Sequence, residues 1–538
     1  MTIAMEDRRF IVGIDLGTTN CAVSFLDTEA DGLDARSIRN FPVLQMIAPG
    51  EVATAPVLPS FLYLPGEYDI AKDALVRLWD EEAARFAGIF ARDHGAGVPD
   101  RLVSSAKSWL CHADVDRRAR ILPWGSSDEV PKVSPVTATA AYLNHIRMVW
   151  NQARGDDEAL HLENQLVVVT VPASFDEVAR ELTLEAAKQA GLDEIILLEE
   201  PLAAFYSWLM RHERNWRETV APGQMILVCD VGGGTTDFTL IVLTDHEGSP
   251  RFERIAVGDH LILGGDNIDL ALARRVETRL GGARRSMSTR RWKELCHQCR
   301  QAKEALLGGE KTQYTVTVMG RGSKLIADTL TAELQQDEVT EVVLEGFFPL
   351  VDGSRTNGPE SRKGITEFGL PYEREPAVTK HLLWFLHRHA EDVRRSLNRN
   401  TPLPDWILCN GGSLKADIVQ RRIQTAAGRG FQIEDGQAPR LLENPDLDTA
   451  VSLGAAYYGL VKIGRGVKVG SGSPRAYFLG VTRPEDIEPK TPEAVCVVER
   501  GLEEGNIVSL ENRAFEVLTN QPVSFDLYSS SYRSGDRH

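Results

Sequence analysis

Long apolar runs, cysteine pairs and excess positive charge are all scarce in this 538-residue sequence. No apolar stretch approaches the roughly 20 residues that a membrane-spanning helix needs, and the opening MTIAMEDRRF lacks the apolar core of a secretory signal. The net charge is -17, from 60 Lys and Arg against 77 Asp and Glu, which argues against nonspecific binding to nucleic acid or anionic membranes. We therefore expect a cytoplasmic protein that binds neither nucleic acid nor membrane.

Cysteine is infrequent, with seven residues in the chain. Several lie in apolar segments such as MILVCDV and DWILCNGG, where a thiol packs as a small hydrophobic side chain, and this usage is typical of a reducing compartment. Only Cys296 and Cys299 have the spacing of a metal-ligand pair, and no second pair completes a zinc site. The residues around them, LCHQCRQAKEALL, predict a helix.

The chain does contain an alternation of apolar, strand-like runs with amphipathic helical segments. The runs include RFIVGIDL, NQLVVVTVP, MILVCDVG and DWILCNGG, while EVARELTLEAAKQAG and DLALARRVETRLGG predict helices. This alternation is typical of an α/β fold. Residues 351–376 are rich in glycine, proline and charge and predict a long surface loop, and a loop of that length in a compact domain usually has a function.

The final part of the chain differs in character. Residues 464–476 are rich in glycine and serine and predict an interdomain linker. Beyond them the apolar runs are short, and in PVSFDLY apolar and polar residues alternate, as in a half-buried strand. We therefore expect an α/β domain over residues 1–463, the linker, and a small β-rich domain over residues 477–538.

Two segments of the α/β part share one plan. IVGIDLGTTN (residues 11–20) and ILVCDVGGGTTD (residues 226–237) each have an apolar strand that ends in aspartate, a glycine-containing turn and two threonines. Either motif alone is equally consistent with an ordinary hairpin whose turn needs glycine. Together, the two motifs indicate a duplicated domain that grips one ligand between two lobes.

The chemistry of these turns suits a polyphosphate with Mg²⁺. Glycine lets backbone N–H groups approach a phosphate closely because no Cβ intervenes. Asp15, Asp230 and Asp237 stand at strand ends, where a carboxylate can hold Mg²⁺ directly or through water. No GxxxxGK[ST] motif occurs, so the chain is not a P-loop protein. The turn residues are Gly17, Thr18, Thr19, Gly232, Gly233, Gly234, Thr235 and Thr236.

The order of the motifs resembles the ATPase domain of the heat-shock protein 70 family, the DnaK-type chaperones. The two glycine motifs are similar to its phosphate motifs, and VVVTVPASFDEVARELTLEAAKQAGLDEIILLEEPLAAFYSW to the segment between them. LGGDNIDLALA, LCHQCRQAKEALL, ILCNGGSLKADIVQRRI and NPDLDTAVSLGAAY follow in the family's order, so the resemblance covers about residues 10–460. It implies an actin-like, two-lobed fold of duplicated ribonuclease-H-like domains that binds ATP or ADP with Mg²⁺ and hydrolyses ATP.

The resemblance also implies roles for single residues. Asp15 and Asp230 match the carboxylates that organise Mg²⁺ and its waters. Lys107 matches the lysine that reaches the γ-phosphate, although Ser-Trp follows it where the family commonly has Arg-Leu. Glu200 matches the carboxylate that orients the attacking water, and Asp237 is a second candidate. Because phosphoryl transfer passes through a loose transition state, positioning and charge stabilisation suffice, and no covalent intermediate is implied. The implied catalytic set is Lys107, Glu200, Asp237 and Thr235.

The part of the site that would hold the nucleoside departs from the family. Lys303 matches the lysine that contacts the ribose, but Arg300 stands where a glutamate is usual. Glu304 replaces an arginine and Leu307 a serine. Lys415 replaces an arginine whose planar guanidinium would stack on adenine, and Glu304 and Lys415 are able to pair across the pocket. The purine is then held more loosely or by different contacts, with adenine favoured by resemblance alone. With the turn residues above, the implied nucleotide-binding set is Gly264, Gly265, Lys303, Gly411, Gly412, Ser413, Lys415 and Asp446.

Two features concern communication and partners. Pro172 and Arg180 match a pair that passes nucleotide occupancy to the family's second domain, although an X-Pro turn followed by a helix-surface charge explains them equally well. RAYFLGV, VVERGLEEGNIVSL and PVSFDLYSSSY resemble the opening strands of the family's β-sandwich for extended peptides, without its helical lid. We expect either a fragment of a longer chaperone-like protein, which we favour, or a chain that lacks the lid. The implied partners are unfolded or extended polypeptide clients and co-chaperones.

Three functions are compatible with such a fold. The first is a chaperone-type ATPase whose nucleotide state switches peptide or partner binding. The second is a small-molecule kinase, which needs a base beside a bound hydroxyl substrate, and no sugar site is recognisable unless the loop at residues 351–376 contains one. The third is a filament-forming ATPase, which needs self-complementary surfaces. The blocks VPASF, LGGDNID and GGSLK favour the first.

Overall fold

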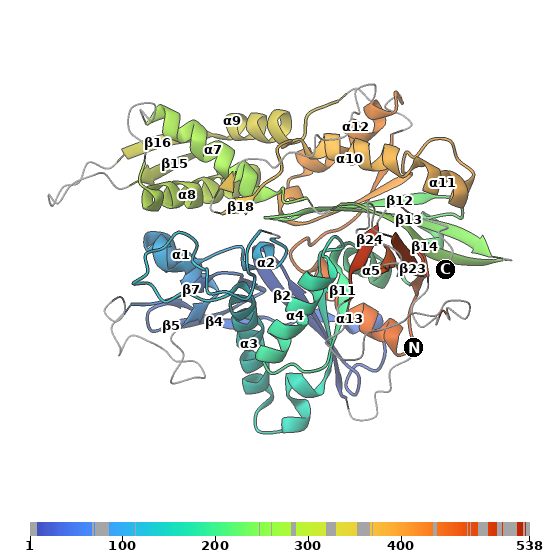
Figure 1. Ribbon diagram of the computed structural model, residues 1–538, viewed down its shortest axis with the longest axis horizontal. Coiled ribbons are helices and arrows are strands. Elements are labelled where there is room, and N and C mark those ends of the chain that lie inside the picture. The colour runs from blue at the N-terminus through green and yellow to red at the C-terminus, as the bar shows by residue number, and fades with distance from the viewer. Residues whose placement is uncertain are drawn as a thin grey trace.

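The chain folds into two lobes, one above the other in Figure 1, in a computed structural model. Lobe I, the lower one, is built on a sheet from residues 8–220, and lobe II on a sheet from residues 225–442, with one later strand. The expected mixture of helices and strands is confirmed. The structure describes residues 8–66, 69, 85–112, 114–246, 248–259, 261–280, 287–318, 330–351, 366–367, 369–433, 438–470, 472–473, 475–481, 493–502, 508, 525–530 and 533.

The sheet of lobe I has the strand order β11-β10-β1-β2-β3, with β6 beside β2. β1 pairs with β10 in parallel and with β2 as an antiparallel hairpin, and the first glycine motif forms the turn of that hairpin. The central strands are apolar on both faces, as expected of a sheet that is covered on both sides. The strands are β1 (Phe10–Leu16), β2 (Asn20–Asp27), β3 (Arg39–Asn40), β6 (Val57–Pro59), β10 (Leu166–Val171) and β11 (Ile195–Glu199).

The sheet of lobe II has the order β20-β19-β12-β13-β14-β21. Its centre repeats lobe I: β12 and β13 form an antiparallel hairpin around the second glycine motif, and β19 pairs with β12 in parallel on the other side. The two motifs therefore occupy equivalent hairpin turns, as their shared plan predicts. The strands are β12 (Met225–Val231), β13 (Thr236–His246), β14 (Ser249–Val257), β19 (Trp406–Asn410), β20 (Arg440–Leu442) and β21 (Val469–Gly470).

Helices cover both sheets, and their starts are set locally. Ser134, for example, accepts a hydrogen bond from the Thr137 N–H at 3.0 Å and is followed by Pro135 at the first helical position of α3, a favourable N-terminus. The helices of lobe I are α1 (Ile89–Gly97), α2 (Ala106–Trp109), α3 (Pro135–Arg154), α4 (Glu177–Gln189), α5 (Glu200–His212) and α6 (Trp216–Thr219). Those that follow are α7 (Gly265–Arg279), α8 (Thr289–Leu307), α9 (Gln336–Glu341), α10 (Val378–Arg388), α11 (Ala390–Leu397), α12 (Asp417–Gly430) and α13 (Ala450–Lys462).

Two helices join the lobes at their base. α5 follows β11 in lobe I, and α13 follows β20 in the equivalent place of lobe II. Their apolar side chains share one buried cluster with strands of both sheets. The Ser24 hydroxyl of β2 also lies 2.8 Å from that of Ser452 in α13. The lobes are therefore connected by a common core, which leaves their opposite ends to form the site.

Smaller sheets complete the molecule. The helical prediction around Cys296 and Cys299 is confirmed, because both lie buried on α8. A π-helical turn, Val342–Phe347, follows α9. The short strands are β4 (Val43–Ala48), β5 (Glu51–Ala55), β7 (Leu62–Tyr63), β8 (Phe86–Ala87), β9 (Leu102–Val103), β15 (Gln313–Val318), β16 (Leu330–Gln335), β17 (Thr366–Glu367) and β18 (Leu370–Pro371).

The segment expected to be a linker contributes a strand. Val469 and Gly470 form β21, which pairs in parallel with Phe252 and Glu253 of β14, and Val469 is fully buried. The alternation of small and apolar residues in VKVGSG predicts no strand by itself, because the pairing depends on the free edge of β14. The boundaries of the two predicted domains and of the linker stay a prediction.

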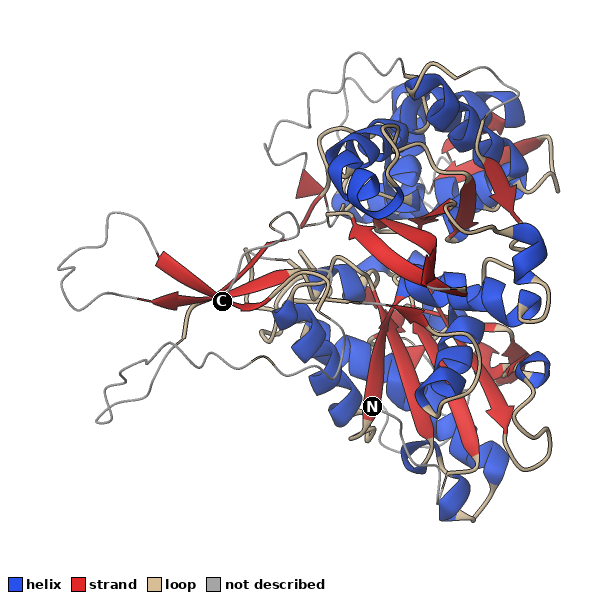
Figure 2. Cartoon of the chain, turned by 90° about the vertical axis from the view of Figure 1, so that its right-hand side faces the viewer, coloured by secondary structure: helices blue, strands red, loops and turns tan. Residues whose placement is uncertain are grey.

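The tail is β-structured where it is described. β22 (Ala476–Val481) lies between β23 (Glu493–Val498) and β24 (Leu527–Ser530), and this small sheet projects from the two lobes in Figure 2. The Tyr477 hydroxyl donates to Glu177 of α4 at 2.5 Å, which fixes one side of the sheet to lobe I.

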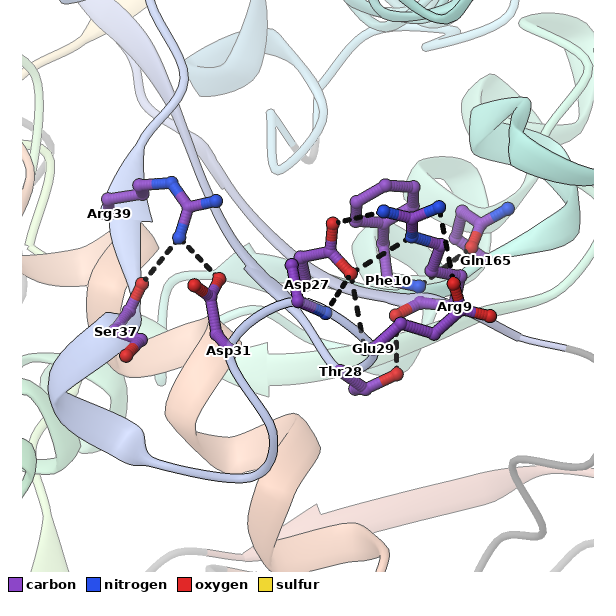
Figure 3. Close-up of polar contacts among 10 residues, drawn as sticks. Arg9, Phe10, Asp27, Thr28, Glu29, Asp31, Ser37, Arg39 and Gln165 are labelled. Atoms are coloured by element: carbon purple, nitrogen blue, oxygen red, sulfur yellow. Dashed lines mark hydrogen bonds and ion pairs between the residues drawn. The ribbon is translucent and has the colours of Figure 1, made fainter.

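A polar network fixes the outer end of the first hairpin (Figure 3). Arg9 donates to both carboxylate oxygens of Asp27, at 2.9 and 2.7 Å, and the Phe10 N–H donates to the Gln165 side chain at 2.9 Å. The Thr28 hydroxyl donates to the Arg9 carbonyl at 2.6 Å. The network lies at the start of β1, at the opposite end of the strand from Asp15.

No helix within the described parts of the chain is long and apolar enough to cross a membrane.

Candidate active site

The two glycine turns lie against each other where the lobes meet. A Cβ on Gly233 would overlap the hydroxyl of Thr19, and one on Gly234 would lie 2.8 Å from Thr18 Cγ2 and 2.9 Å from Ser108 Oγ. The turns are far apart in the sequence, and each closes a hairpin of a different lobe. The structure thus brings the two predicted phosphate turns together, with no room for a side chain between them.

Two further glycine segments surround the second turn. The Gly265 N–H donates to the Gly232 carbonyl at 3.0 Å, and the Asp266 N–H to the Gly233 carbonyl at 2.7 Å. The Ser413 hydroxyl also donates to the Gly232 carbonyl, at 2.8 Å. Since α7 begins at Gly265, its positive N-terminal end faces the same place, which favours a bound anion.

Asp15 and Asp230 occupy equivalent positions at the ends of β1 and β12. Asp15 accepts a hydrogen bond from the Thr170 hydroxyl on β10 at 3.1 Å. Asp230 accepts one from the Asn410 side-chain amide on β19 at 2.9 Å. Each carboxylate is therefore oriented by a neutral polar residue on the parallel neighbour of its strand. Asp237 faces Asp230 across the β12–β13 hairpin.

Lys107 and Glu200 form a buried ion pair beside these carboxylates. Lys107 lies on α2, and Glu200 is the first residue of α5. Burial lowers the pKa of Lys107, but Glu200 and Asp15 outweigh that effect and raise the pKa above its usual value. Lys107 therefore stays charged at neutral pH. The Lys107 side chain is only 5% exposed, so it is not a solvated lysine on a helix surface.

The acidic groups repel one another. Burial raises the pKa of Asp15 to about 7, with a further contribution from Glu200. Burial likewise raises the pKa of Asp237 to about 7 and lifts that of Asp230 well above its usual value. A site with three such carboxylates requires either protons or a cation to reduce its negative charge.

The residues present fit a polyphosphate with Mg²⁺. Ser108 Oγ and Asp237 Oδ1 are buried with no hydrogen-bond partner among the described residues, and an unpaired buried polar atom costs free energy unless a ligand or water satisfies it. No three His, Cys, Asp or Glu side chains of the described chain gather into a metal cluster. Asp15 and Asp230 would therefore hold Mg²⁺ together with phosphate oxygens and waters, which is this ion's usual coordination.

The expected pairing of Glu304 with Lys415 is wrong. Lys415 donates instead to Asp448 at 2.7 Å, and both side chains are partly exposed. Asp448 comes from the turn before α13, so the pair forms only because α13 returns to this place. Asp446 accepts a hydrogen bond from the Asp448 N–H at 3.0 Å and one from the Thr449 hydroxyl at 2.5 Å, and so holds that turn.

Arg300, another departure from the family, belongs to a buried network with Lys303. Arg300 contacts Asp266 and donates to Asp269 at 2.8 Å. Lys303 lies 2.7 Å from Asp269 and donates to the Gly265 carbonyl at 3.1 Å. The two acidic groups raise the pKa of Arg300 although burial opposes this. Arg300 thus neutralises two carboxylates of α7 next to the second phosphate turn.

Comparisons with known proteins agree with this geometry. A family model described as Hsp70 protein matches residues 122–347. A chaperone protein HscA homolog from Burkholderia ambifaria is 30% identical over 439 residues, which is 78% of this chain and 60% of that protein. Its counterpart from Cupriavidus pinatubonensis is 28% identical over 435 residues, with the same coverage of both chains. The chain belongs to the Hsp70 family.

This Hsp70-family chain spans only part of its relatives. It covers about 60% of the length of the two HscA homologs, and 45% of chaperone protein HscA from Salmonella agona, to which it is 29% identical over 328 residues.

Pro172 and Arg180 lie near the site but on different elements. The Pro172 carbonyl, just after β10, accepts from the Phe175 N–H at 3.2 Å. Arg180, on α4, donates to Glu199 at 2.9 Å, and its side chain is only 20% exposed. Arg180 is therefore paired rather than an isolated surface charge. Glu199 directly precedes Glu200, so the pair lies one residue from the predicted catalytic carboxylate.

Sequence reasoning missed the residues that orient the carboxylates. Thr170 and Asn410 each stand at the end of an apolar run, in VVVTVP and ILCNGG, and such polar residues at strand ends were the available signal. Ser60 was also missed: its hydroxyl donates to the Gly17 carbonyl at 2.7 Å, and its N–H to the Thr19 carbonyl at 2.8 Å. No spacing in the sequence connects residue 60 with the first turn.

The raised pKa values predict how stability depends on pH. The folded chain without metal or nucleotide keeps protons on Asp15 and Asp237 up to about pH 7, whereas the unfolded chain loses them near pH 4. Raising the pH from 5 to 8 should therefore lower the thermal unfolding temperature, and Asp15→Asn should make that decrease smaller. Thermal scans in a metal-free buffer check this. Asp27→Asn is the control, because Arg9 lowers the pKa of Asp27 and Asp27 therefore titrates below pH 5. If the unfolding temperature of Asp15→Asn falls with pH as steeply as that of the wild type, the prediction is wrong.

Proposed function

We propose that this chain is a Mg²⁺-dependent ATPase of the chaperone type, whose nucleotide state switches the binding of a polypeptide or partner protein. The observation that supports it best is the pair of equivalent hairpin turns, each preceded by an aspartate and brought together with Lys107 and Glu200. The repeated sheets support the actin-like arrangement of duplicated ribonuclease-H-like lobes. The cytoplasmic location stays a prediction.

Different residues of the chain would bind the phosphates, stabilise their charge and orient the attacking water. The turns at residues 17–19 and 232–235 would bind the phosphates through backbone N–H groups and hydroxyls. Lys107 would place a positive charge on the terminal phosphate, and Glu200 would orient the attacking water, with Asp237 beside it. Asp15 and Asp230 would hold Mg²⁺, which would supply positive charge to offset that of the phosphates. In a loose transition state such positioning and charge stabilisation provide most of the catalysis.

The ion pair of Lys107 and Glu200 has a consequence for the order of events. Without nucleotide, each group neutralises the other in a buried place. A phosphate that binds Lys107 competes with Glu200 for it, which would release the carboxylate to accept a water proton. The pair therefore holds both catalytic groups in place before the substrate arrives.

A chain of contacts supports communication with the tail. Glu199 pairs with both Arg180 and Arg254, and Arg254 donates to the Gly472 carbonyl at 3.0 Å. Gly472 lies two residues after the end of β21, in the segment between lobe II and the tail. Movement of Glu200 on nucleotide binding would reach this segment through its neighbour Glu199. Pro172 and Arg180 would then act as the predicted switch.

Turnover and peptide binding test the function together. We expect slow, Mg²⁺-dependent ATP hydrolysis with no sugar or glycerol present, and poor binding of a labelled apolar heptapeptide in fluorescence anisotropy. An incomplete β-sandwich predicts that the apolar side chains of the tail are partly exposed or packed against the lobes rather than enclosed in a core. Phe525 and Leu527 are 63% and 56% exposed. Phe515, Val517 and Val523, to which the same prediction applies, lie outside the described residues. Hydrolysis that requires an added hydroxyl substrate would indicate a kinase. Micromolar peptide binding released by ATP would contradict the second expectation.

The residues at the nucleoside end of the site predict weak discrimination between ATP and GTP. Lys415 is engaged by Asp448 and offers no planar face to stack on adenine. We expect dissociation constants for ATP and GTP within about tenfold, a difference of about 1.4 kcal/mol at most, in a competition titration. Lys415→Arg should increase the preference for ATP, whereas Lys311→Arg, at an exposed site of lobe II, should not. A strong preference for ATP in the wild type would show that other residues hold the base.

A further inference from the structure

Two unusual features of the sequence meet between the lobes. One is the Ser-Trp pair that follows Lys107, and the other is the end of the breaker-rich segment at residues 351–376, just beyond the part matched by the family model. Trp109 stacks near Trp124, with ring centroids 4.9 Å apart, and both rings lie against Gly369. Gly369 has a φ of +85°, and a Cβ there would lie 2.6 Å from each indole, so only glycine allows this contact.

The contact joins elements of both lobes. His112, just after α2 in lobe I, lies 2.9 Å from the Gly369 carbonyl through its Nε2 atom. The next residues, Leu370 and Pro371, form β18, which lies at the edge of the upper lobe that faces the lower one in Figure 1. Leu370 and Tyr372 belong to the apolar cluster of lobe I although they lie in the part of the chain that forms lobe II.

A cavity of about 130 Å³ lies behind this contact. α1, β9 and the segment from Leu122 to Trp124 form its lobe I side, and α7, α8 and Tyr372 form the other. Its walls are mainly aromatic and aliphatic. The apolar side chains that line it include Phe61, Leu102, Trp109, Trp124, Leu370 and Tyr372.

The charged groups of the cavity are already paired. Arg300 contacts Asp266 and Asp269, and the Ser105 hydroxyl donates to Asp266 at 3.1 Å. Lys293 lies 3.9 Å from Asp100. Burial lowers the pKa of His297 to about 4, so its imidazole is neutral at pH 7. A charged ligand would have to break one of these pairs, whereas a neutral one would not.

The size and walls of the cavity restrict the ligand further. An engineered apolar cavity of about 150 Å³ holds one benzene molecule, so this cavity has room for one ring. A sugar of that size would place several hydroxyls against leucine and tryptophan side chains and leave them without partners, which costs free energy for each. An aromatic ring packs favourably between indole and phenol faces.

We propose that this cavity, which adjoins the second glycine turn through Asp266, is a binding site for a small, neutral molecule with a single aromatic ring. One polar substituent on the ring is accommodated at the end lined by Ser105 and Asp266. Both lobes supply walls, so the site is complete only when they lie together as described.

Phenol is the probe, and saturation-transfer NMR measures its binding. We expect saturable binding to the wild-type chain and none of comparable affinity for D-glucose. Ala96 of α1 is half-buried and lines the cavity, so Ala96→Phe should fill it and weaken phenol binding at least tenfold. Ala153→Phe, on the exposed face of α3, is the matched control and should bind phenol as the wild type does. Thermal scans verify that both variants are folded.

A second cavity variant and a competition with ADP test the proposed phenol site further. Trp124 is 40% exposed, so Trp124→Ala removes a wall of the cavity with little loss of core packing and should weaken binding at least threefold. Saturating ADP with Mg²⁺ should leave phenol bound. Unchanged affinity in both cavity variants, preference for glucose, or displacement by ADP would overturn the proposal. The ADP comparison rests on the proposed nucleotide site, whereas the Ala96→Phe and Ala153→Phe comparison does not.

Discussion

Replacing either Asp15 or Asp230 by asparagine should reduce Mg²⁺-dependent ATP hydrolysis at least a hundredfold, a change of about 2.7 kcal/mol in the barrier. Both carboxylates end a central strand next to a glycine turn, and each is oriented by one neutral side chain, Thr170 or Asn410. Asparagine keeps the size of the side chain but removes the charge that Mg²⁺ requires. Single-turnover hydrolysis over a range of Mg²⁺ concentrations measures the effect.

The control for these variants is Asp27→Asn. Asp27 lies at the other end of the same hairpin and pairs with Arg9 (Figure 3), so its replacement disturbs an ion pair of the sheet but not the site. We expect nearly wild-type turnover from it. Folding of all three variants is checked by circular dichroism. Near wild-type turnover in both Asp15→Asn and Asp230→Asn, with the fold intact, would refute the assignment of the metal carboxylates.

Replacing Lys107 by alanine should reduce hydrolysis by tenfold or more, at least about 1.4 kcal/mol, while ATP still binds. The lysine is almost completely buried and pairs with Glu200, so its ammonium group is fixed close to both the carboxylates and the first turn. Its loss would remove a positive charge from the transition state and leave Glu200 buried without its partner. Calorimetry of ATP binding together with single-turnover kinetics separates the two effects.

Glu200→Gln gives the matched comparison. If the two groups act as a pair, the double variant should lose less activity than the two single losses combined, because each single change already disrupts the pair. Lys188→Ala, at an exposed site of α4, should leave turnover unchanged. Parallel loss of binding and turnover in Lys107→Ala would identify the lysine as a ground-state anchor instead.

Local features of the sequence predicted the elements that carry the site. The apolar runs ending at Asp15 and Asp230 became central strands, and the glycines and threonines after them became hairpin turns. Such features are readable because strand formation and turn geometry depend on residues within a few positions of each other. The helical period around Cys296 and Cys299 was sufficient for the same reason.

Partners that come from distant segments were not predictable in this way. Lys415 was expected to contact Glu304, but α13 places Asp448 beside it. Arg300 was recognised as unusual, yet its contact with Asp266 and Asp269 depends on how α8 packs on α7. Val469 joined a sheet because β14 had a free edge. Strand register and helix packing determine which of several charged neighbours a side chain pairs with. No local sequence pattern contains this information.

The sequence by itself determined that this chain has two similar strand-turn-strand units, each with an aspartate before a glycine turn, and hence an α/β protein suited to a polyphosphate. Only the tertiary structure decided that Lys107 pairs with Glu200, that Thr170 and Asn410 orient the two aspartates, and that Gly369 meets Trp109 between the lobes. The physical reason is the range of the interactions. Backbone conformation follows from near neighbours, whereas the pairing of buried charges and the closure of a cavity require segments from both lobes to be packed together.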